Sequence, residues 1–240
     1  CRSLKDTCEK YEIPLLSGKD SMYVDGHLEG SFGERVKVSA LETVQISATS
    51  VVKDITKCMT LEPKASGDLV YVVGATANEM GASEYYELFH KTGLNVPHVH
   101  HERFKVAYRA MQKAIENELA ASCHAVARGG IAVHLSYLVM AGGFGLDIEL
   151  SGLPTDDSRG TILNETALLS ESAGRFIVTI APENKTVFEK LFKGIPFGCI
   201  GTVAENHDHL KVNGLSGEFL IDLPMADLET AFNKLFGDMI

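Results

Sequence analysis

The chain has 240 residues, with 22 Lys and Arg against 32 Asp and Glu, which gives a formal net charge of −10. This acidity argues against a surface for nucleic acid or anionic membrane, because both are polyanions and need a basic face. The length and a hydrophobic share of 45% are sufficient for a sizeable core without a disulfide or a structural metal.

The beginning of the chain holds few predicted elements. Charged residues 2–11 predict a helix that ends before Pro14, because proline disfavours helix at the residue that precedes it. An extended run at residues 15–18 follows, and then a glycine-rich excursion over residues 23–39. Alternating apolar and polar residues predict a strand at 44–52.

This first segment buries too little apolar surface to fold alone, since two or three strands and one helix make a marginal core. We therefore expect its strands to pair with chain upstream of Cys1 or with another subunit, so that the isolated chain dimerises or needs upstream sequence. The absence of a start Met agrees with a piece of a longer protein. Residues 61–67 (LEPKASG) have linker composition and predict two domains, 1–66 and 67–240.

The second part alternates strand and helix patterns, which predicts an α/β sandwich with helices on one face of the sheet. Its last two strands are expected to form a closing hairpin. The predicted strands are residues 68–74, 145–150, 176–180, 200–204 and 210–212, and the predicted helices are 79–90, 104–121, 129–139 and 184–192.

The five cysteines are odd in number and scattered, without a Cys-x-x-Cys pair. This pattern predicts reduced, buried thiols in a cytoplasmic protein rather than a secreted disulfide framework. The longest apolar stretch, residues 131–146, is interrupted by His134, Ser136 and three glycines. It is shorter than the roughly 20 residues that a membrane-spanning helix needs.

A first candidate site follows Pro14, at residues 17–21 (SGKDS). Glycine lets backbone amides approach a phosphate, lysine neutralises it, aspartate can hold Mg²⁺, and serine can bond an oxygen. The segment lacks the two glycines of a Walker A loop, so a polar turn after an extended run is the alternative interpretation.

A second candidate site is the Gly129-Gly130 pair, which enters a predicted helix and can offer free amides to an anion, or can serve close packing against a sheet. A third lies at residues 169–176 (LSESAGRF). There Glu171 and Arg175 are candidates for substrate contact or for a surface ion pair.

Histidines gather at residues 98–101 (HVHH), a pattern that can chelate a transition metal. Glu102 is the one carboxylate at ligand spacing, and Pro97 indicates a loop. We therefore interpret the cluster as a surface tract without a complete ligand set. No Ser/His/Asp triad can be assembled from local signatures.

Four segments occur together in the order found in one family: residues 14–22 (PLLSGKDSM), 81–85 (GASEY), 123–132 (CHAVARGGIA) and 169–176. In these segments the chain resembles the second of two homologous halves of the synthetase subunit of phosphoribosylformylglycinamidine synthases. These are members of the AIR synthase-related superfamily. The resemblance runs over essentially all 240 residues.

The resemblance implies part of an AIR-synthase-like N-terminal domain, whose strands join a shared barrel, followed by a complete AIR-synthase-like C-terminal α/β sandwich domain. It implies an ATP- and Mg²⁺-dependent ligase that converts formylglycinamide ribonucleotide to the amidine in purine biosynthesis. The implied partners are the upstream half of the same enzyme and a glutamine amidotransferase that delivers ammonia. The family's catalytic histidine falls outside this chain.

Carried over residue by residue, the resemblance places Gly18 against nucleotide, Lys19 and Asp20 near phosphate or metal, and Ser21 toward substrate. Some members carry Asn as a metal ligand where this chain has Lys19, so Asp20 is the candidate ligand. At the segment that corresponds to residues 124–130, members of the family usually have the sequence His-Asp-x-Ser-Asp-Gly-Gly. This chain carries Ala125, Ala127 and Arg128 in place of the oxygen-bearing residues.

Two interpretations remain open. In the first, the chain supplies part of a shared nucleotide and substrate site, as the intact turn at residues 17–21 indicates. In the second, it is a degenerate, structural half that holds the catalytic half in place, as the loss of oxygen ligands after His124 indicates. Another AIR synthase-related enzyme, such as a selenophosphate synthetase, is disfavoured, because no reactive Cys lies in a glycine-rich N-terminal loop.

Overall fold

The computed structural model describes residues 2–18, 25–39 and 44–234. Contacts divide the chain into two units, Cys1–Ile55 and Thr56–Ile240. This division precedes the linker-like segment at residues 61–67. The domain boundary expected after residue 66 stays a prediction, because a division by contacts within one chain does not define an evolutionary domain.

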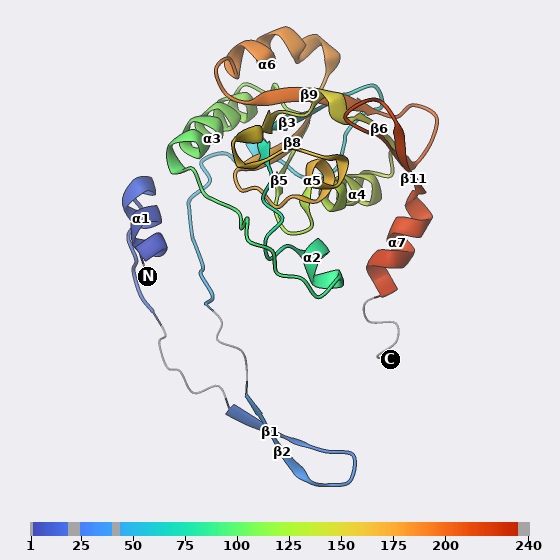
Figure 1. The fold of residues 1–240 in the computed structure, drawn as a ribbon. Coiled ribbons are helices and arrows are strands. Elements are labelled where there is room, and N and C mark those ends of the chain that lie inside the picture. Colours follow the sequence, from blue (N-terminus) through green and yellow to red (C-terminus); the bar gives the residue numbers. More distant parts are fainter. Residues whose placement is uncertain (1, 19–24, 40–43, 235–240) are drawn as a thin grey trace. The chain divides into compact units, whose positions relative to one another are not determined.

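Unit 1 begins with α1 (Arg2–Tyr11), which confirms the predicted helix. Strands β1 (Asp25–Glu29) and β2 (Arg35–Ser39) pair antiparallel as a hairpin (Figure 1). The excursion expected over residues 23–39 therefore contains, in its described part, a hairpin that the sequence analysis did not predict. The chain reverses at Gly33, whose φ of 78° lies in the left-handed region that glycine tolerates.

Residues 44–52 form no strand in the described structure, contrary to the prediction. Their apolar side chains are exposed, with Val44 82% and Ile46 65% accessible. A strand needs a hydrogen-bonded neighbour, and no described strand pairs with this segment. Alternation identifies a segment suited to a sheet surface but not the partner that would complete the sheet.

Unit 2 is built on a seven-stranded sheet of order β11-β10-β6-β9-β3-β8-β5 (Figure 1). Neighbouring described strands are antiparallel, except for the parallel pair β10 and β6. This architecture confirms the predicted mixed α/β class. The strands are β3 (Leu69–Val73), β5 (Ser122–Val126), β6 (Leu146–Glu149), β8 (Arg175–Ile180), β9 (Phe197–Val203), β10 (His209–Asn213) and β11 (Phe219–Pro224).

The predicted closing hairpin of β9 and β10 is wrong. Strand β6 lies between them, paired with β9 through Leu146 and Val203 and with β10 through Leu146 and Leu210. The hairpin partner of β10 is β11. Two apolar runs joined by a short polar loop satisfy a hairpin pattern locally, but a third strand from earlier in the chain occupies the position between them.

Helices cover both faces of the sheet, whereas the sequence predicted one. Strand β3, which lies inside the sheet, explains why. Val70 and Val72 pack with residues of α4 (Gly130–Gly142) and α5 (Asn164–Leu169), whereas Tyr71 and Val73 pack with residues of α3 (His101–Glu116) and α6 (Lys185–Leu191). A strand that is apolar on both sides needs cover on both sides. Figure 1 shows α6 and α4 on opposite sides of the sheet. The helices of unit 2 are α2 (Glu84–Leu88), α3 (His101–Glu116), α4 (Gly130–Gly142), α5 (Asn164–Leu169), α6 (Lys185–Leu191) and α7 (Met225–Asn233).

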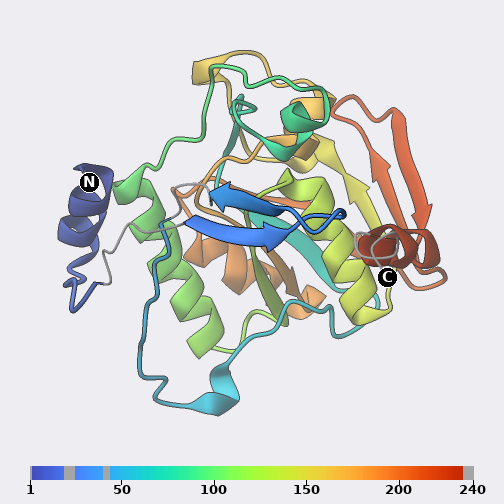
Figure 2. The same ribbon diagram turned by 90° about the horizontal axis from the view of Figure 1, so that it is seen from below.

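Smaller elements complete unit 2. Helix α7 contacts α4, with the rings of Tyr137 and Phe232 6.0 Å apart (Figure 2). Strands β4 (Thr76–Ala77) and β7 (Thr155–Asp156) form a short parallel pair that places the 3-10 helix η3 (Asp157–Arg159). Among the described helices, none has both the length and the apolar character needed to cross a membrane.

The cysteines of the described chain are free thiols. Cys123 is half-buried, and burial raises the pKa of its thiol to about 11, so it stays protonated at neutral pH. Cys58 is exposed, which corrects the expectation that all of these thiols are buried.

Candidate functional site

The predicted phosphate turn at residues 17–21 lies in unit 1. Ser17 and Gly18 are exposed and belong to no helix or strand. A Cβ on Gly18 would meet no described atom within 4 Å, so the described fold has no steric need for glycine at this position. Lys19, Asp20 and Ser21 lie outside the described residues, and their roles stay predictions.

The Gly129-Gly130 pair stands between β5 and α4, where the chain turns sharply. Gly129 has φ 86° and is the N-cap of α4, and Gly130 has φ 71°. A Cβ on Gly130 would lie 2.6 Å from the carbonyl oxygen of Leu168 and 2.7 Å from the backbone of Leu169. The end of α5 thus packs directly on this backbone, and the packing interpretation of the glycine pair accounts for Gly130.

The amides at this turn already face an anion, the carboxylate of Glu171. Its Oε1 accepts hydrogen bonds from the backbone N–H of Gly129 at 2.8 Å and of Glu84 at 2.9 Å. Both donors lie at helix N-termini, where negative charge is stabilised. The protein's own carboxylate therefore occupies the place where a bound phosphate would accept these bonds.

The neighbouring side chains do not suit a magnesium–nucleotide complex. Ala125 and Ala127 offer no side-chain oxygen to a metal, and Arg128 is ion-paired with Glu84. Mg²⁺ prefers carboxylate and other hard oxygen ligands. The residues of the β5–α4 turn therefore do not fit the metal and nucleotide that the family pattern implies.

A histidine pair lies beneath the same turn. The N–H of Ala127 donates to Nε2 of His134 at 2.8 Å, so the proton of a neutral His134 is on Nδ1. That Nδ1–H can donate to Nε2 of His124, 2.7 Å away. Burial lowers the pKa of both rings, and the His124 ring lowers that of His134 further. The pair therefore supports the turn as two neutral rings.

Arg175 of the third motif is 1% exposed, so the alternative of a surface ion pair with Glu171 is wrong. Its guanidinium donates to the carbonyl oxygens of Ser172 at 2.9 Å and Ser170 at 2.5 Å and to Oγ1 of Thr76 at 2.9 Å. Burial lowers the pKa of Arg175 to about 10, which leaves it charged at neutral pH. The hydroxyls of Ser170 and Ser172 bond the backbone of Ala77, so this motif ties β4 to the start of β8.

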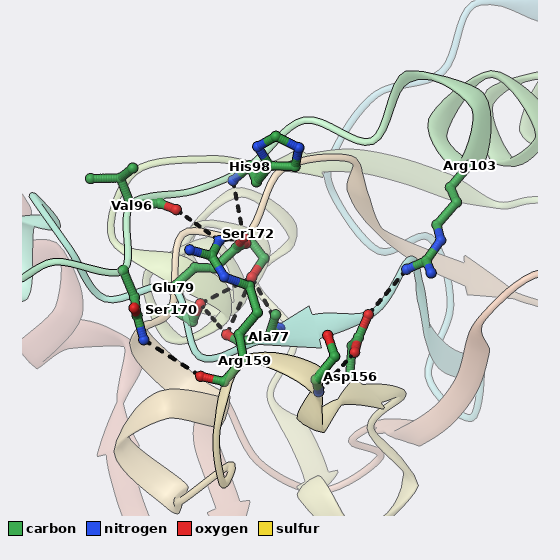
Figure 3. A network of polar contacts seen from close by, with 11 residues as sticks. Ala77, Glu79, Val96, His98, Arg103, Asp156, Arg159, Ser170 and Ser172 are labelled. Carbon is green, nitrogen blue, oxygen red and sulfur yellow. Dashed lines mark hydrogen bonds and ion pairs between the residues drawn. The ribbon is translucent and has the colours of Figure 1, made fainter.

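A small cleft, with a volume of about 80 Å³, lies within unit 2 near the start of α3. Arg103 on α3 reaches Asp156 across it, with Nη1 and Oδ2 3.0 Å apart (Figure 3). Arg159 of η3 enters the same cleft. The polar lining consists of Glu79, His98, His100, Arg103, Asp156, Ser158, Arg159 and Ser172.

Buried Glu79 organises one wall of this cleft. Its Oε1 lies 2.5 Å from Nη1 of Arg159 and accepts the backbone N–H of His98 at 3.0 Å. Arg159 also donates to the carbonyl oxygen of Val96 at 3.0 Å. Figure 3 shows Arg159 between Glu79 and the segment that carries Val96 and His98. One ion pair thus fixes the loop before α3 against η3.

Of the histidines of residues 98–101, His98 and His100 line this cleft, with their ring centroids 4.7 Å apart. Within the described residues, no group of three or more His, Cys, Asp or Glu side chains is arranged to hold a metal ion.

The sequence interpretation missed Glu79, Arg103, Asp156 and Arg159. They are far apart in the chain, and each stands in a segment with ordinary surface composition. The indirect signal was Pro97 with the histidines after it, which marked a loop with polar residues but not the residues that face it.

Comparison with known proteins identifies the class. The family model described as "AIR synthase related protein, C-terminal domain" matches residues 65–213. The chain belongs to this AIR synthase-related family. It is 30% identical over 214 residues to the phosphoribosylformylglycinamidine synthase subunit PurL of Alkaliphilus metalliredigens, covering 88% of the chain and 27% of that protein.

The same subunit of Methanocaldococcus jannaschii is 28% identical over 246 residues, covering 99% of this chain and 32% of that protein. The chain therefore spans about a third of the length of these relatives. Four short segments predicted a relationship to the phosphoribosylformylglycinamidine synthases, and the comparison confirms it.

Solved structures agree in fold. T. maritima PurL complexed with FGAR superposes with a TM-score of 0.64 at 19% identity, covering 72% of this chain and 30% of that one. The structure of PurLQS from Thermotoga maritima gives 0.61 at 17% identity, and T. maritima PurL complexed with ATP gives 0.57 at 18%. They cover 72% of this chain and 28% and 27% of the respective neighbour.

Proposed function

We propose that the chain is part of an ATP-dependent ligase that converts formylglycinamide ribonucleotide to formylglycinamidine ribonucleotide in purine biosynthesis. The observation that carries this proposal is the extent of the similarity. It covers 99% of the chain in the M. jannaschii subunit and so includes residues 17–21 as well as the C-terminal family domain.

The chemistry needs the substrate's amide oxygen to be phosphorylated and ammonia to displace the phosphate. When bound, ATP with Mg²⁺ supplies the phosphoryl group. In this proposal the backbone N–H of Gly18 bonds a phosphate oxygen, and Lys19 and Asp20 organise charge around it, with Asp20 as the metal ligand. The hydroxyl of Ser21 orients the substrate. A T. maritima relative crystallised with ATP supports the choice of nucleotide.

A structural role for unit 2 is the second candidate, and the Glu171 carboxylate favours it. Because this side chain bonds the amides of Gly129 and Glu84, the β5–α4 turn has its anion position filled from within. We infer that the chain contributes to the reaction through residues 17–21 and not through this turn. In this proposal the second site of the family pattern has a structural role.

The proposed partners are the remainder of the same enzyme and a glutamine amidotransferase that supplies ammonia, in the cytoplasm. The limited share of the relatives that the chain covers and the T. maritima PurLQS assembly support this choice. The chain alone is proposed to be inactive, because the family's catalytic histidine is expected outside it.

The experiment is steady-state conversion of formylglycinamide ribonucleotide by the enzyme that contains this chain, with ATP and ammonium chloride. Gly18→Val should lower kcat/KM by about tenfold or more, because a side chain there would block the approach of a phosphate. Ser21→Ala should lower it by about fivefold, the value of one hydrogen bond.

Gly26→Val is the matched control, since Gly26 lies in the same unit and a Cβ there meets its nearest atom at an ordinary 3.9 Å. All three variants should melt at the wild-type temperature. Wild-type kinetics in both Gly18→Val and Ser21→Ala would assign the whole chain to the structural role.

A further inference from the structure

The histidine pair beneath the β5–α4 turn has a defined pattern of protons. The backbone N–H of Ala127 donates to Nε2 of His134 at 2.8 Å, so the proton of the neutral His134 ring is on Nδ1. That Nδ1–H donates to Nε2 of His124 at 2.7 Å. Each ring therefore has one nitrogen without a proton, and both of these nitrogens already accept a hydrogen bond.

An additional proton finds no vacant nitrogen in this arrangement. On Nε2 of His134 it would face the N–H of Ala127, and on Nε2 of His124 it would face the Nδ1–H of His134. Either position turns a hydrogen bond into two opposed N–H groups. His124 is half-buried whereas His134 is 5% exposed, so the proton reaches His124 first.

The hydrogen bond that is lost is the one at Ala127. A charged imidazolium donates a stronger hydrogen bond than a neutral ring, so protonated His124 stays bonded to His134 by donating to its Nδ1. His134 must then carry its own proton on Nε2, which faces the N–H of Ala127. Protonation thus keeps the two rings together and leaves the backbone of the turn without its acceptor.

The surroundings of the pair oppose protonation at neutral pH. Burial lowers the pKa of both rings, and for His134 the His124 ring and the charge of Arg175 on β8 lower it further. From α4, the ring of Tyr137 stands edge-on to both histidines, with its centroid 5.4 Å from that of His134 and 6.4 Å from that of His124. The carboxylate of Glu171 faces the turn, where it bonds backbone amides.

The turn is also connected to the start of α2. Oε1 of Glu171 accepts the N–H of Gly129 at 2.8 Å and the N–H of Glu84 at 2.9 Å, and the side chains of Arg128 and Glu84 form an ion pair. Gly129 stands two residues after Ala127. A turn that loses its bond at Ala127 therefore loses the support that positions Gly129 against the shared carboxylate.

We propose that the β5–α4 turn is a proton-operated switch, in which one proton taken up by His124 and His134 breaks the hydrogen bond of Ala127 and releases the turn together with the start of α2. An imidazole ordinarily titrates near pH 6.5, so the switch responds to acidification below this value. The sheet beneath the turn stays folded. This proposal is independent of the ligase function proposed above.

Hydrogen exchange followed by mass spectrometry tests the switch in the enzyme that contains this chain. Protection at pH 7.5 and pH 5.5 is compared after correction for the intrinsic exchange rate. Peptides within residues 125–130 should lose protection about fivefold to tenfold at the lower pH, the effect of one proton that the open turn binds and the closed turn excludes. Residues 83–88 should lose protection with them. Strand β3 should be better protected than the turn at both pH values, because the turn opens without the sheet.

Two variants bracket the expected behaviour. The double variant His124→Gln/His134→Gln keeps side-chain acceptors and donors for the two hydrogen bonds but does not titrate, so its turn should be equally protected at both pH values. His134→Phe keeps a ring but removes the acceptor of Ala127, so its turn should be no better protected at pH 7.5 than that of the wild type at pH 5.5. His90→Asn is the matched control, a change at an exposed histidine outside the pair, and should keep the wild-type response.

Equal protection of the wild-type turn at the two pH values would overturn the proposal, as would a loss in the double glutamine variant as large as that in the wild type. If the turn and β3 are equally protected, the turn opens only when the whole sheet unfolds, and it is not a switch. Should the double variant fail to fold, His134→Phe decides in its place: a turn as well protected as the wild type at pH 7.5 would exclude the role of the Ala127 bond.

Discussion

At the β5–α4 turn, the carboxylate of Glu171 lies against the amides of Gly129 and Glu84. In the cleft, two guanidinium groups lie against carboxylates and keep further donors toward solvent. Both places pair opposite charges, but the turn uses its donors within the protein whereas the cleft leaves some of them accessible. Glycines at a helix N-terminus therefore indicate a site for a negative charge. That charge can come from a side chain of the same protein, as it does here from Glu171.

The largest expected effect tests how closely the turn is packed. Gly130→Ala should destabilise the protein by about 3 kcal/mol, since it combines a left-handed φ with overlap on the backbone of α5. Gly143→Ala is the matched control, with φ 69° but open space, and should cost about 1 kcal/mol. Urea unfolding measures both. Equal losses would mean that the α5 backbone moves aside.

The second-largest expected effect tests the carboxylate of Glu171 at the β5–α4 turn. Glu171→Ala should cost about 2 kcal/mol, because it leaves two helix N-terminal amides without their charged acceptor. Glu171→Gln retains one oxygen acceptor and should cost about 1 kcal/mol. Denaturant midpoints at one pH compare the two. If Glu171→Ala is as stable as the wild type, the carboxylate is not what stabilises this turn.

A pH dependence should come from the histidine pair beneath the turn. Burial lowers the pKa of His124 and His134 in the folded protein, so below the ordinary value of 6.5 the unfolded chain binds more protons than the folded one. Stability should therefore fall as the pH decreases from 6.5 toward the folded pKa values, and should be independent of these rings above 7.

The measurement is the free energy of unfolding between pH 5 and pH 8, in the wild type and in His124→Asn. The variant should show a shallower loss below pH 6.5. His90→Asn, a change at an exposed histidine on the loop after α2, should keep the wild-type slope. A variant slope equal to that of the wild type would assign the acid sensitivity to other groups.

The smallest expected effect is at the cleft. Arg103→Gln should change the free energy of unfolding by less than about 1 kcal/mol, because the Arg103 side chain in its ion pair with Asp156 is largely exposed. A chemical denaturation curve is sufficient to test this. A loss of stability as large as that of Glu171→Ala would mean that Arg103 stabilises the fold. The turn and the cleft would then not differ in this respect.

Much of unit 2 could be predicted because its patterns are local. Residues 69–73 are a short apolar run, residues 101–116 carry a helical stripe, and glycines stand at the start and end of α4. Strand pairing could not be predicted in the same way. The position of β6 between β9 and β10 depends on contacts between segments some 60 residues apart, which no local period contains.

The candidate site, too, could be predicted from the sequence only where its signals are local. The glycine pair at the β5–α4 turn was found from its composition, but the interpretation of its role required Glu171, 42 residues further along. Glu79 and Arg159 are 80 residues apart and meet only in the folded chain. Alternation at residues 44–52 indicated a sheet surface, although none of the described strands pairs with this segment.

The place of β3 inside the sheet, between β8 and β9, has a consequence for synthesis. It is the first strand of unit 2 to be made, yet its neighbours β8 and β9 begin at Arg175 and Phe197. At the usual rate of about 5–20 residues per second, the ribosome needs roughly 5–20 seconds to add the next hundred residues. During this interval the apolar run Leu69–Val73 has no strand to pair with. The nascent chain therefore passes through an aggregation-sensitive stage that the finished fold conceals.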